Sequence, residues 1–256
     1  MTTKPVFSKS QYAYEEIKQR ILADELHPGA ALSQEGIAAE LGVSTTPVRE
    51  ALKRLAAEGL MTLETHRDAR VTELTFEEAQ SLYEVRSHVD PLAAGWAAQR
   101  RTGADVEAIR RALDALDPLT GTSGIQALNA HRDFHRAVYR ASHNEPMIGI
   151  LDSLWDKADR YRQFTLRHRA GSASEDARVR REHRALAEAV IGGESGTAEE
   201  VMRGHIEQSL GRQAMEALRP GRPRALTGPV GSGRAGPVSD RRPGAAVPGR
   251  SQPRAG

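Results

Sequence analysis

The sequence contains no cysteine among its 256 residues, which excludes disulfide bonds and leaves no thiolate to bind a metal. It also lacks any apolar run near the roughly 18 residues that a membrane-spanning helix requires. The segment beginning at Met1 has no charged-then-apolar leader. Three catalytic motifs are absent as well: a serine elbow, a phosphate-binding loop and a dinucleotide-binding glycine pattern. We therefore expect a soluble, cytoplasmic protein.

Positive charge is concentrated at one end of the chain. Residues 219–256 hold eight Arg and one Asp, a net charge of +7, so the formal +2 of the whole chain leaves −5 for residues 1–218. That tail also has seven Pro and eight Gly in 38 residues, which predicts a disordered segment without a core. Residues 1–75 carry nine basic and eleven acidic side chains, so any affinity for nucleic acid must come from a local patch.

Two short helical patterns meet at a tight turn in residues 33–60. Ser33 is suited to the N-cap of the first helix, and Gly42 gives the backbone the freedom that a sharp corner needs. The second helix carries an apolar stripe of Val48, Leu52 and Leu55. This spacing predicts a helix-turn-helix over about 34–53, although an ordinary amphipathic helical hairpin would show the same pattern.

The free side of the second helix supplies candidates for DNA contact. Its N-terminal half presents Thr45, Thr46, Arg49 and Lys53, where a recognition helix offers side chains and backbone N–H groups to phosphates and base edges. After Gly59, two short apolar runs predict a β-hairpin whose polar tip covers residues 65–68. Arg67 and Arg70 could reach DNA from this hairpin or could simply be solvated.

Together with an upstream helical stripe that starts at Tyr14, these elements compose a winged helix over residues 10–75, preceded by a flexible stretch over 1–9. The run LSQEGIAAELGVSTTPVREALKRLAAEGLMTLETHRDARVTELT closely resembles the DNA-binding domain of the GntR family of bacterial transcription regulators. Two positions depart from that family. Thr45 stands where Arg is usual, and Asp68 stands where the wing usually has Gly. Both changes alter DNA contact, so the operator sequence of relatives does not transfer.

Every long segment of residues 76–218 has helical period, which predicts an all-α second domain of about six helices. The first starts at Thr75, which opens a capping box, and runs to about Arg101. Arg86 lies on the apolar stripe of this helix, so it either pairs with an internal carboxylate or awaits an acidic ligand. The remaining helices are expected over 105–116, 125–141, 146–169, 177–191 and 197–218.

Four of the nine histidines fall on inward-facing stripes of three predicted helices: His131, His135, His183 and His205. His131 and His135 are one helical turn apart and can chelate one ion. A single inward histidine is more often a hydrogen-bonded core residue, but four that converge predict a metal site. Without cysteine, imidazoles favour a borderline cation such as Zn²⁺ or Ni²⁺.

The same segments resemble the FCD-type ligand-binding domain of the FadR subfamily of GntR regulators, and the resemblance covers about residues 10–215. It implies a metal site of His135, His183 and His205, with His131 in the place of the usual Asp. It also implies that Arg86 faces the effector. Asp90 stands where Glu is more common, and Tyr161 and Arg162 are further candidates for effector contact.

The sequence thus predicts a homodimeric transcription regulator that binds a near-palindromic operator and responds to a small carboxylic or sugar acid. Two alternatives stay open. One is a regulator that senses the metal itself. The other is a metal-dependent hydrolase, although Arg132 follows His131 where a His-Glu-x-x-His protease needs Glu.

Overall fold

The computed structural model describes residues 8–64, 68–116, 125–168 and 172–221. The predicted flexible start up to residue 7 and the tail from residue 222 lie outside the described residues, as does Arg67 at the wing tip. Among the described residues no helix is both long and apolar enough to cross a membrane.

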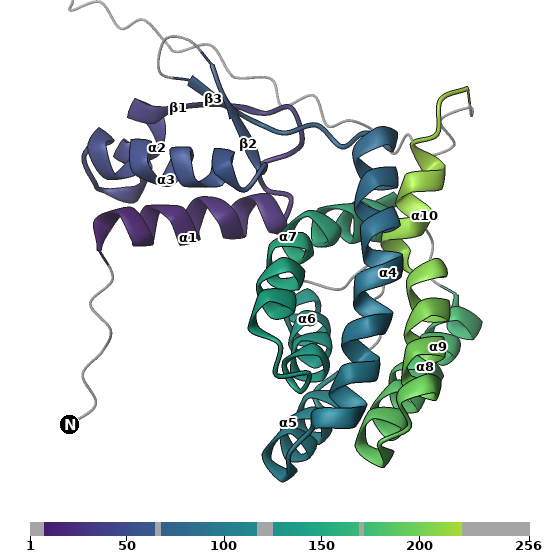
Figure 1. Cartoon of the computed structure of the whole chain (residues 1–256). Coiled ribbons are helices and arrows are strands. Elements are labelled where there is room, and N and C mark those ends of the chain that lie inside the picture. The colour runs from purple at the N-terminus through teal and green to yellow at the C-terminus, as the bar shows by residue number, and fades with distance from the viewer. Residues whose placement is uncertain (1–7, 65–67, 117–124, 169–171, 222–256) are drawn as a thin grey trace, which may run out of the picture. The chain divides into compact units, whose positions relative to one another are not determined.

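The N-terminal part combines three helices with a small antiparallel sheet (Figure 1). Apolar side chains from all of these elements form one core, which includes Ile17, Leu52 and Leu55. The fold is the winged helix-turn-helix that the sequence predicts. Its elements in chain order are α1 Lys9–Leu22, β1 Ala31–Ser33, α2 Gln34–Leu41, α3 Thr45–Ala57, β2 Met61–Leu63 and β3 Asp68–Val71.

Local signals in the sequence explain the helix-turn-helix. The hydroxyl of Ser33 accepts a hydrogen bond from the Gly36 amide at 3.0 Å and so caps α2. Gly42 ends this helix at φ 65°, a left-handed conformation that glycine adopts without strain. Ser44 occupies the N-cap position of α3, but its side chain makes no capping hydrogen bond within the described part of the chain. The turn therefore depends chiefly on Gly42.

The wing contains one more strand than the sequence analysis expects. The sheet order is β1-β3-β2, so the short strand before α2 pairs with the second wing strand, with Ala31 opposite Arg70. Asp68, predicted at the loop tip, instead opens β3 opposite Ser33. A strand of three residues is too short to show alternation, which is why the pattern did not reveal β1.

The C-terminal part is all helical. Its described helices are α4 Phe76–Arg100, α5 Gly103–Asp114, α6 Ile125–Arg140, α7 Glu145–His168, α8 Ala173–Gly192, α9 Ser195–Glu207 and α10 Leu210–Ala217. Thr75 caps α4, because its hydroxyl accepts from the Glu78 amide at 3.1 Å, but the described residues do not form the full capping box that the sequence predicts, and the Glu78 side chain instead accepts from Tyr161. The last helix expected from the sequence is divided in two at Ser209, whose side chain caps α10.

Helices α4 and α9 lie side by side (Figure 1). Gly95 on α4 permits this approach, since a Cβ built there would overlap the Glu199 side chain of α9. Helix α8 packs beside α9, and α6 and α7 contact α4. Helix α6 and the consecutive helices α8 and α9 thereby bring their inward faces together.

Candidate functional site

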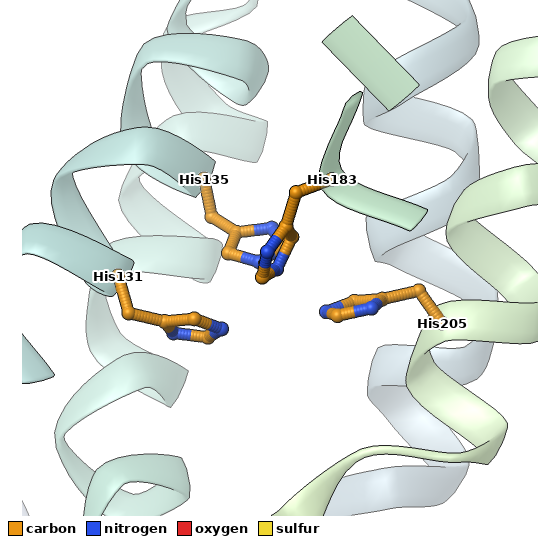
Figure 2. Close-up of side chains that lie close together, drawn as sticks. All are labelled: His131, His135, His183 and His205. Carbon is orange, nitrogen blue, oxygen red and sulfur yellow. The ribbon is translucent and has the colours of Figure 1, made fainter. Parts of the chain in front are cut away.

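Four buried histidines meet in the middle of the helical part (Figure 2). His131 and His135 extend from α6, His183 from α8 and His205 from α9. One potential ligand nitrogen from each lies within 4.8 Å of the others. The Nε2 atoms of His135 and His183 are 3.2 Å apart. All four histidines predicted to face inward are therefore brought together.

The separation of one pair of these nitrogens matches that expected around a divalent cation. Nitrogen ligands about 2.05 Å from a tetrahedral zinc would be roughly 3.3 Å apart, close to the separation of the two Nε2 atoms. Burial, aided by the positive charge of Arg162, lowers the pKa of each of these four histidines. Their imidazoles are therefore neutral at pH 7 and keep a lone pair for a metal. A set of four neutral nitrogen donors suits Zn²⁺ or Ni²⁺.

The carboxylate of Glu182 orients the imidazole ring of His205. His205 donates from Nδ1 to Glu182 at 2.9 Å, which leaves Nε2 to face the other histidines. Glu182 also pairs with Arg178. Although partial burial opposes ionisation, the contact with His205 lowers the pKa of Glu182. The sequence analysis missed Glu182 because an acidic residue next to His183 looks like part of a solvated helix face.

Two arginines lie buried beside the histidines. Arg86 is fully buried and donates to Asp90 from Nη2 at 2.6 Å. The sequence left open an internal carboxylate or an acidic ligand as the partner of Arg86, and the structure has the internal carboxylate. Although burial opposes its charge, the pair with Asp90 raises the pKa of Arg86. Arg162 is 2 % exposed and donates to Asp159 at 3.0 Å. Burial and the nearby charge of Arg86 lower the pKa of Arg162.

Trp155 connects the arginines to the histidines. Its ring lies 4.8 Å from the Arg86 guanidinium and 4.3 Å from that of Arg162. The same ring is 5.2 Å from His135 and 5.8 Å from His131. These five side chains therefore form one buried cluster. The sequence analysis did not single out Trp155, because a core tryptophan gives no separate signal.

Tyr161 takes a different position from the one predicted. Its hydroxyl donates to Glu78 at 2.8 Å and contacts the Thr75 carbonyl oxygen at 3.1 Å, at the start of α4. Within the described residues it makes no ring contact or hydrogen bond with the histidines. The neighbouring Arg162, which the sequence could not distinguish from a surface residue, is the one that joins the cluster.

Several buried polar atoms in or near this cluster have no hydrogen-bond partner among the described residues. Unpaired buried polar atoms are rare and costly in folded proteins, so a group of them indicates a ligand or an ion. The sequence analysis did not single out Tyr83. The atoms are Tyr83 Oη, Arg86 Nη1, His131 Nδ1, His135 Nδ1 and Trp155 Nε1.

The predicted DNA-contact residues on α3 lie on its accessible side. Thr46, Arg49 and Lys53 are exposed and Thr45 is half-exposed, while the apolar stripe on the opposite side is buried. Arg49 makes a long contact of 3.3 Å with the Gln34 side chain, which leaves most of its guanidinium accessible. This face can meet the phosphates and base edges of a DNA groove.

On the wing, Arg70 is already engaged. It donates to Glu64 at 2.7 Å and to the Gly29 carbonyl oxygen at 2.7 Å. A DNA phosphate would have to compete with the Glu64 carboxylate for this guanidinium. Arg70 is thus less available to DNA than Arg49.

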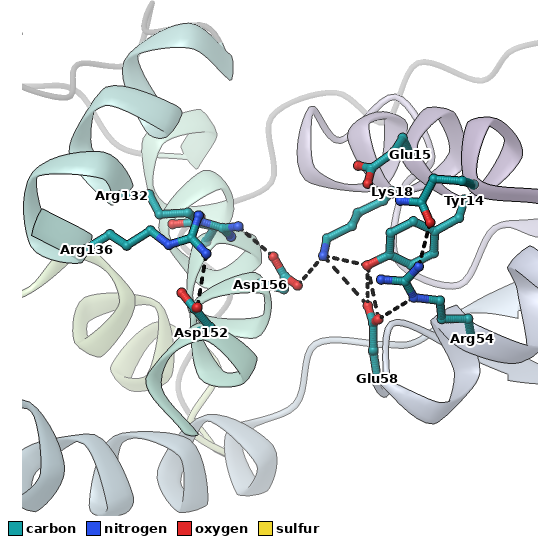
Figure 3. A network of polar contacts seen from close by, with 11 residues as sticks. Tyr14, Glu15, Lys18, Arg54, Glu58, Arg132, Arg136, Asp152 and Asp156 are labelled. Carbon is teal, nitrogen blue, oxygen red and sulfur yellow. Dashed lines mark hydrogen bonds and ion pairs between the residues drawn. The ribbon is translucent and has the colours of Figure 1, made fainter. Parts of the chain in front are cut away.

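A network of ion pairs and hydrogen bonds connects the winged helix to the helical part that carries the histidines (Figure 3). Asp156 on α7 pairs with Arg132 on α6 at 2.7 Å and with Lys18 on α1 at 2.5 Å. Lys18 also donates to the Tyr14 hydroxyl at 2.8 Å, and this hydroxyl donates to Glu58 at 2.8 Å, just after α3. On the other side, Arg132 pairs with Asp159 at 2.6 Å.

Comparison with protein families decides the classification. Residues 9–71 match the gntR family of bacterial regulatory proteins, and residues 81–208 match the FCD domain. The chain belongs to the GntR family. The FCD domain assigns the regulator to the FadR-type subfamily, and the resemblance noted in the sequence is confirmed.

Curated relatives of the regulator are transcription factors. It is 29% identical to a probable D-xylose utilization operon transcriptional repressor of Paenarthrobacter nicotinovorans over 76% of this chain and 84% of the relative. It is 25% identical to the transcriptional repressor GlaR of Escherichia coli over 75% of this chain and 90% of the relative. The regulator is accordingly not an enzyme, and the hydrolase alternative is rejected.

Solved structures share the fold. McbR of E. coli aligns with a TM-score of 0.66 at 20% identity, covering 83% of this chain and 98% of the other. A GntR regulator from Rhodococcus aligns with a TM-score of 0.64 at 21% identity, covering 83% of this chain and all of the other. The winged helix and the helical C-terminal part are therefore a known combination.

Proposed function

We propose that this transcription regulator changes its affinity for an operator when a small organic acid binds beside a divalent metal in the FCD domain. The observation that carries the proposal is the buried cluster of four neutral histidines next to Arg86 and Arg162. His131, His135, His183 and His205 would hold the ion, which we infer to be Zn²⁺ or Ni²⁺. A bound ion would supply positive charge and open coordination positions for carboxylate oxygens.

The chain's own residues would position the acid. The unpaired Nη1 of Arg86 and the guanidinium of Arg162 can donate hydrogen bonds to carboxylate oxygens. A carboxylic or sugar acid fits this arrangement, because two buried cations stabilise an anion more strongly in an apolar surrounding than in water.

For DNA binding we propose a homodimer in which two copies of α3 contact the half-sites of a near-palindromic operator. Thr45, Thr46, Arg49 and Lys53 are the proposed contacts on α3, with Arg70 and Arg67 contributing from the wing. The N-terminal part is proposed to end near residue 75 and the effector domain to span 76–218.

A titration of operator DNA tests this function. The full-length protein, with its metal content measured, is titrated against DNA from its own upstream region at fixed salt, with and without a panel of carboxylic and sugar acids. We expect specific binding that at least one acid changes by about tenfold or more, which is about 1.4 kcal/mol of coupling. A response to metal removal alone, with no acid effective, would instead indicate a metal sensor.

A further inference from the structure

The charges around the histidines are unevenly balanced. Arg86 has Asp90 as its partner, but Arg162 shares Asp159 with Arg132, so among the described residues it has no carboxylate of its own. The four histidines add no negative charge, because an imidazole side chain is either neutral or positively charged. An ion of charge +2 held by them would add further positive charge with no protein carboxylate among its candidate ligands.

Tyr83 adds an unused donor to the same place. It is fully buried, its ring lies 5.7 Å from the Arg86 guanidinium, and its hydroxyl has no partner in the described part of the chain. A Cβ built at Gly211 on α10 would overlap that hydroxyl, so the absence of a side chain at Gly211 provides the space that the hydroxyl occupies. The buried hydroxyl is left unpaired, so it is free to donate a hydrogen bond to a ligand oxygen.

We propose that the effector is an acid with two anionic groups, one at the histidines and the other beside Arg86, Arg162 and the Tyr83 hydroxyl. This inference rests on the proposed function, because it assumes that an acid binds here. Arg86 is already paired with Asp90, so the positive charge left unbalanced belongs to the bound ion and to Arg162, which shares its carboxylate. A diacid can place one anionic group at each, and the group beside Arg162 meets donors that are already buried and pre-positioned.

Binding of chain-matched acids tests the proposal. The metal-loaded, full-length protein is titrated by calorimetry with butanoate and butanedioate, and with pentanoate and pentanedioate. We expect each diacid to bind at least tenfold more tightly than its monoacid. The variant Arg162→Gln should remove this preference, whereas Arg110→Gln, which changes an exposed arginine on α5, should retain it. Tyr83→Phe should weaken diacid binding several-fold, and it serves as the test if Arg162→Gln does not fold.

Equal affinities for mono- and diacids in the native protein would overturn the proposal. An unchanged preference for diacids in Arg162→Gln would also overturn it. If that variant does not fold, unchanged diacid binding in Tyr83→Phe would do so. Monoacids that alter operator affinity without discrimination would overturn this inference but support the proposed function. No effect of any acid on operator affinity would refute both.

A second observation, the contacts of Lys18, supports a separate inference. Lys18 lies on α1 and its Nζ is 2.5 Å from Asp156 Oδ2, while Arg132 binds the other oxygen of that carboxylate at 2.7 Å. Arg132 directly follows His131 in the chain and also pairs with Asp159, the partner of Arg162. An unbroken series of polar contacts thus runs from Arg162, beside the histidines, to α1.

The series continues to the recognition helix. Lys18 binds the Tyr14 hydroxyl, which donates to Glu58 at the C-terminus of α3. Arg54 on α3 stacks 3.7 Å from the centre of the Tyr14 ring and pairs with Glu58 at 3.3 Å. We infer that the Lys18–Asp156 ion pair couples effector binding to the position of α3. A ligand that draws Arg162 away from Asp159 would alter the charges that Arg132 presents to Asp156, and so the restraint on Lys18.

The operator response of three variants tests this coupling. Lys18→Met and Asp156→Asn should each reduce the effector-induced change in operator affinity at least fivefold while leaving metal content and effector affinity in the absence of DNA unchanged. The double variant should lose no more than either single variant, because both remove one interaction. Arg167→Met is the matched control. Arg167 also contacts the N-terminal part, at Asp24, but within the described residues it makes no hydrogen bond or ion pair with Arg132.

A full response in Lys18→Met would refute the inference, and so would an equal loss in Arg167→Met. A native protein that shows no response to any acid would refute the proposed function instead, before the variants are compared.

Discussion

The recognition helix and the histidine cluster use positive charge in opposite ways. On α3, Arg49 and Lys53 are exposed, so water stabilises their charges until DNA phosphates replace it. In the cluster, Arg86 and Arg162 are buried, and each charge is stabilised by a carboxylate, that of Asp90 or Asp159 respectively. An exposed cation can be removed at little cost to the fold, whereas a buried one is tied to the stability of the protein. Variants of the two regions should therefore separate function from folding.

The largest effect is expected at the histidines. The double variant His135→Ala and His183→Ala removes the two nitrogens that face each other at 3.2 Å, so bound metal should fall by at least about tenfold. Elemental analysis of the purified protein measures this loss. His88→Ala, at an exposed position on α4, is the control and should keep the metal. Equal metal content in the double variant would exclude this cluster as the binding site.

The largest effect on folding stability, as distinct from metal content, is expected at the buried ion pair of α4. Arg86→Met leaves Asp90 buried without its partner and should lower the free energy of unfolding by about 3–5 kcal/mol. Urea unfolding measures the change. Arg110→Met breaks an exposed pair with Glu107 and should cost no more than about 0.5 kcal/mol. If the two variants were equally stable, Asp90 would have to be satisfied by another group.

Lowering the pH should reduce the folding stability of the metal-free protein. Burial and nearby positive charge hold the pKa of the four histidines below the ordinary 6.5 of the unfolded chain. Their contribution to stability is complete above pH 6.5 and is lost as the pH falls, by up to about 1.4 kcal/mol per pH unit for each histidine. Urea unfolding at pH 7.5, 6.5 and 5.5 should show this slope. His135→Gln should reduce the slope and His88→Gln should not, and a flat profile in the native protein would contradict the assignment.

The smallest effect on folding stability is expected at α3, where substitution should instead weaken DNA binding. Arg49→Ala should weaken operator binding by about 1–3 kcal/mol and leave the unfolding free energy within about 0.5 kcal/mol of the native value. A fluorescence titration at fixed salt measures the affinity. Arg110→Ala serves as the surface control. Unchanged operator affinity in Arg49→Ala would show that α3 does not read DNA with this side chain.

These two regions also differ in how much the sequence alone predicts. Periodicity gave the buried stripe of α3 and the inward faces of the four histidines, because a helix fixes the direction of each side chain relative to its neighbours. The i, i+4 spacing of Arg86 and Asp90 on α4 could have indicated their ion pair. Periodicity could not give the roles of Tyr83 or Glu182. Their roles depend on how α4, α8 and α9 cross, and such crossings follow from packing across the whole core.

Contacts between sequence-distant residues were beyond prediction for the same reason. Lys18 and Asp156 each look like solvated charges on the surface of an amphipathic helix. The position of Arg162 was also ambiguous, and its burial beside Trp155 appears only in the structure. The short strand β1 had no period to detect.

That strand has a consequence for engineering. Because β1 immediately precedes α2 and pairs with β3, the wing and the helix-turn-helix are joined by one sheet rather than by a free linker. A chimeric regulator that receives only a foreign recognition helix would keep its old wing at a fixed angle to the new helix. DNA specificity should therefore transfer between relatives only when the whole segment from α1 to β3 is exchanged as a single cassette.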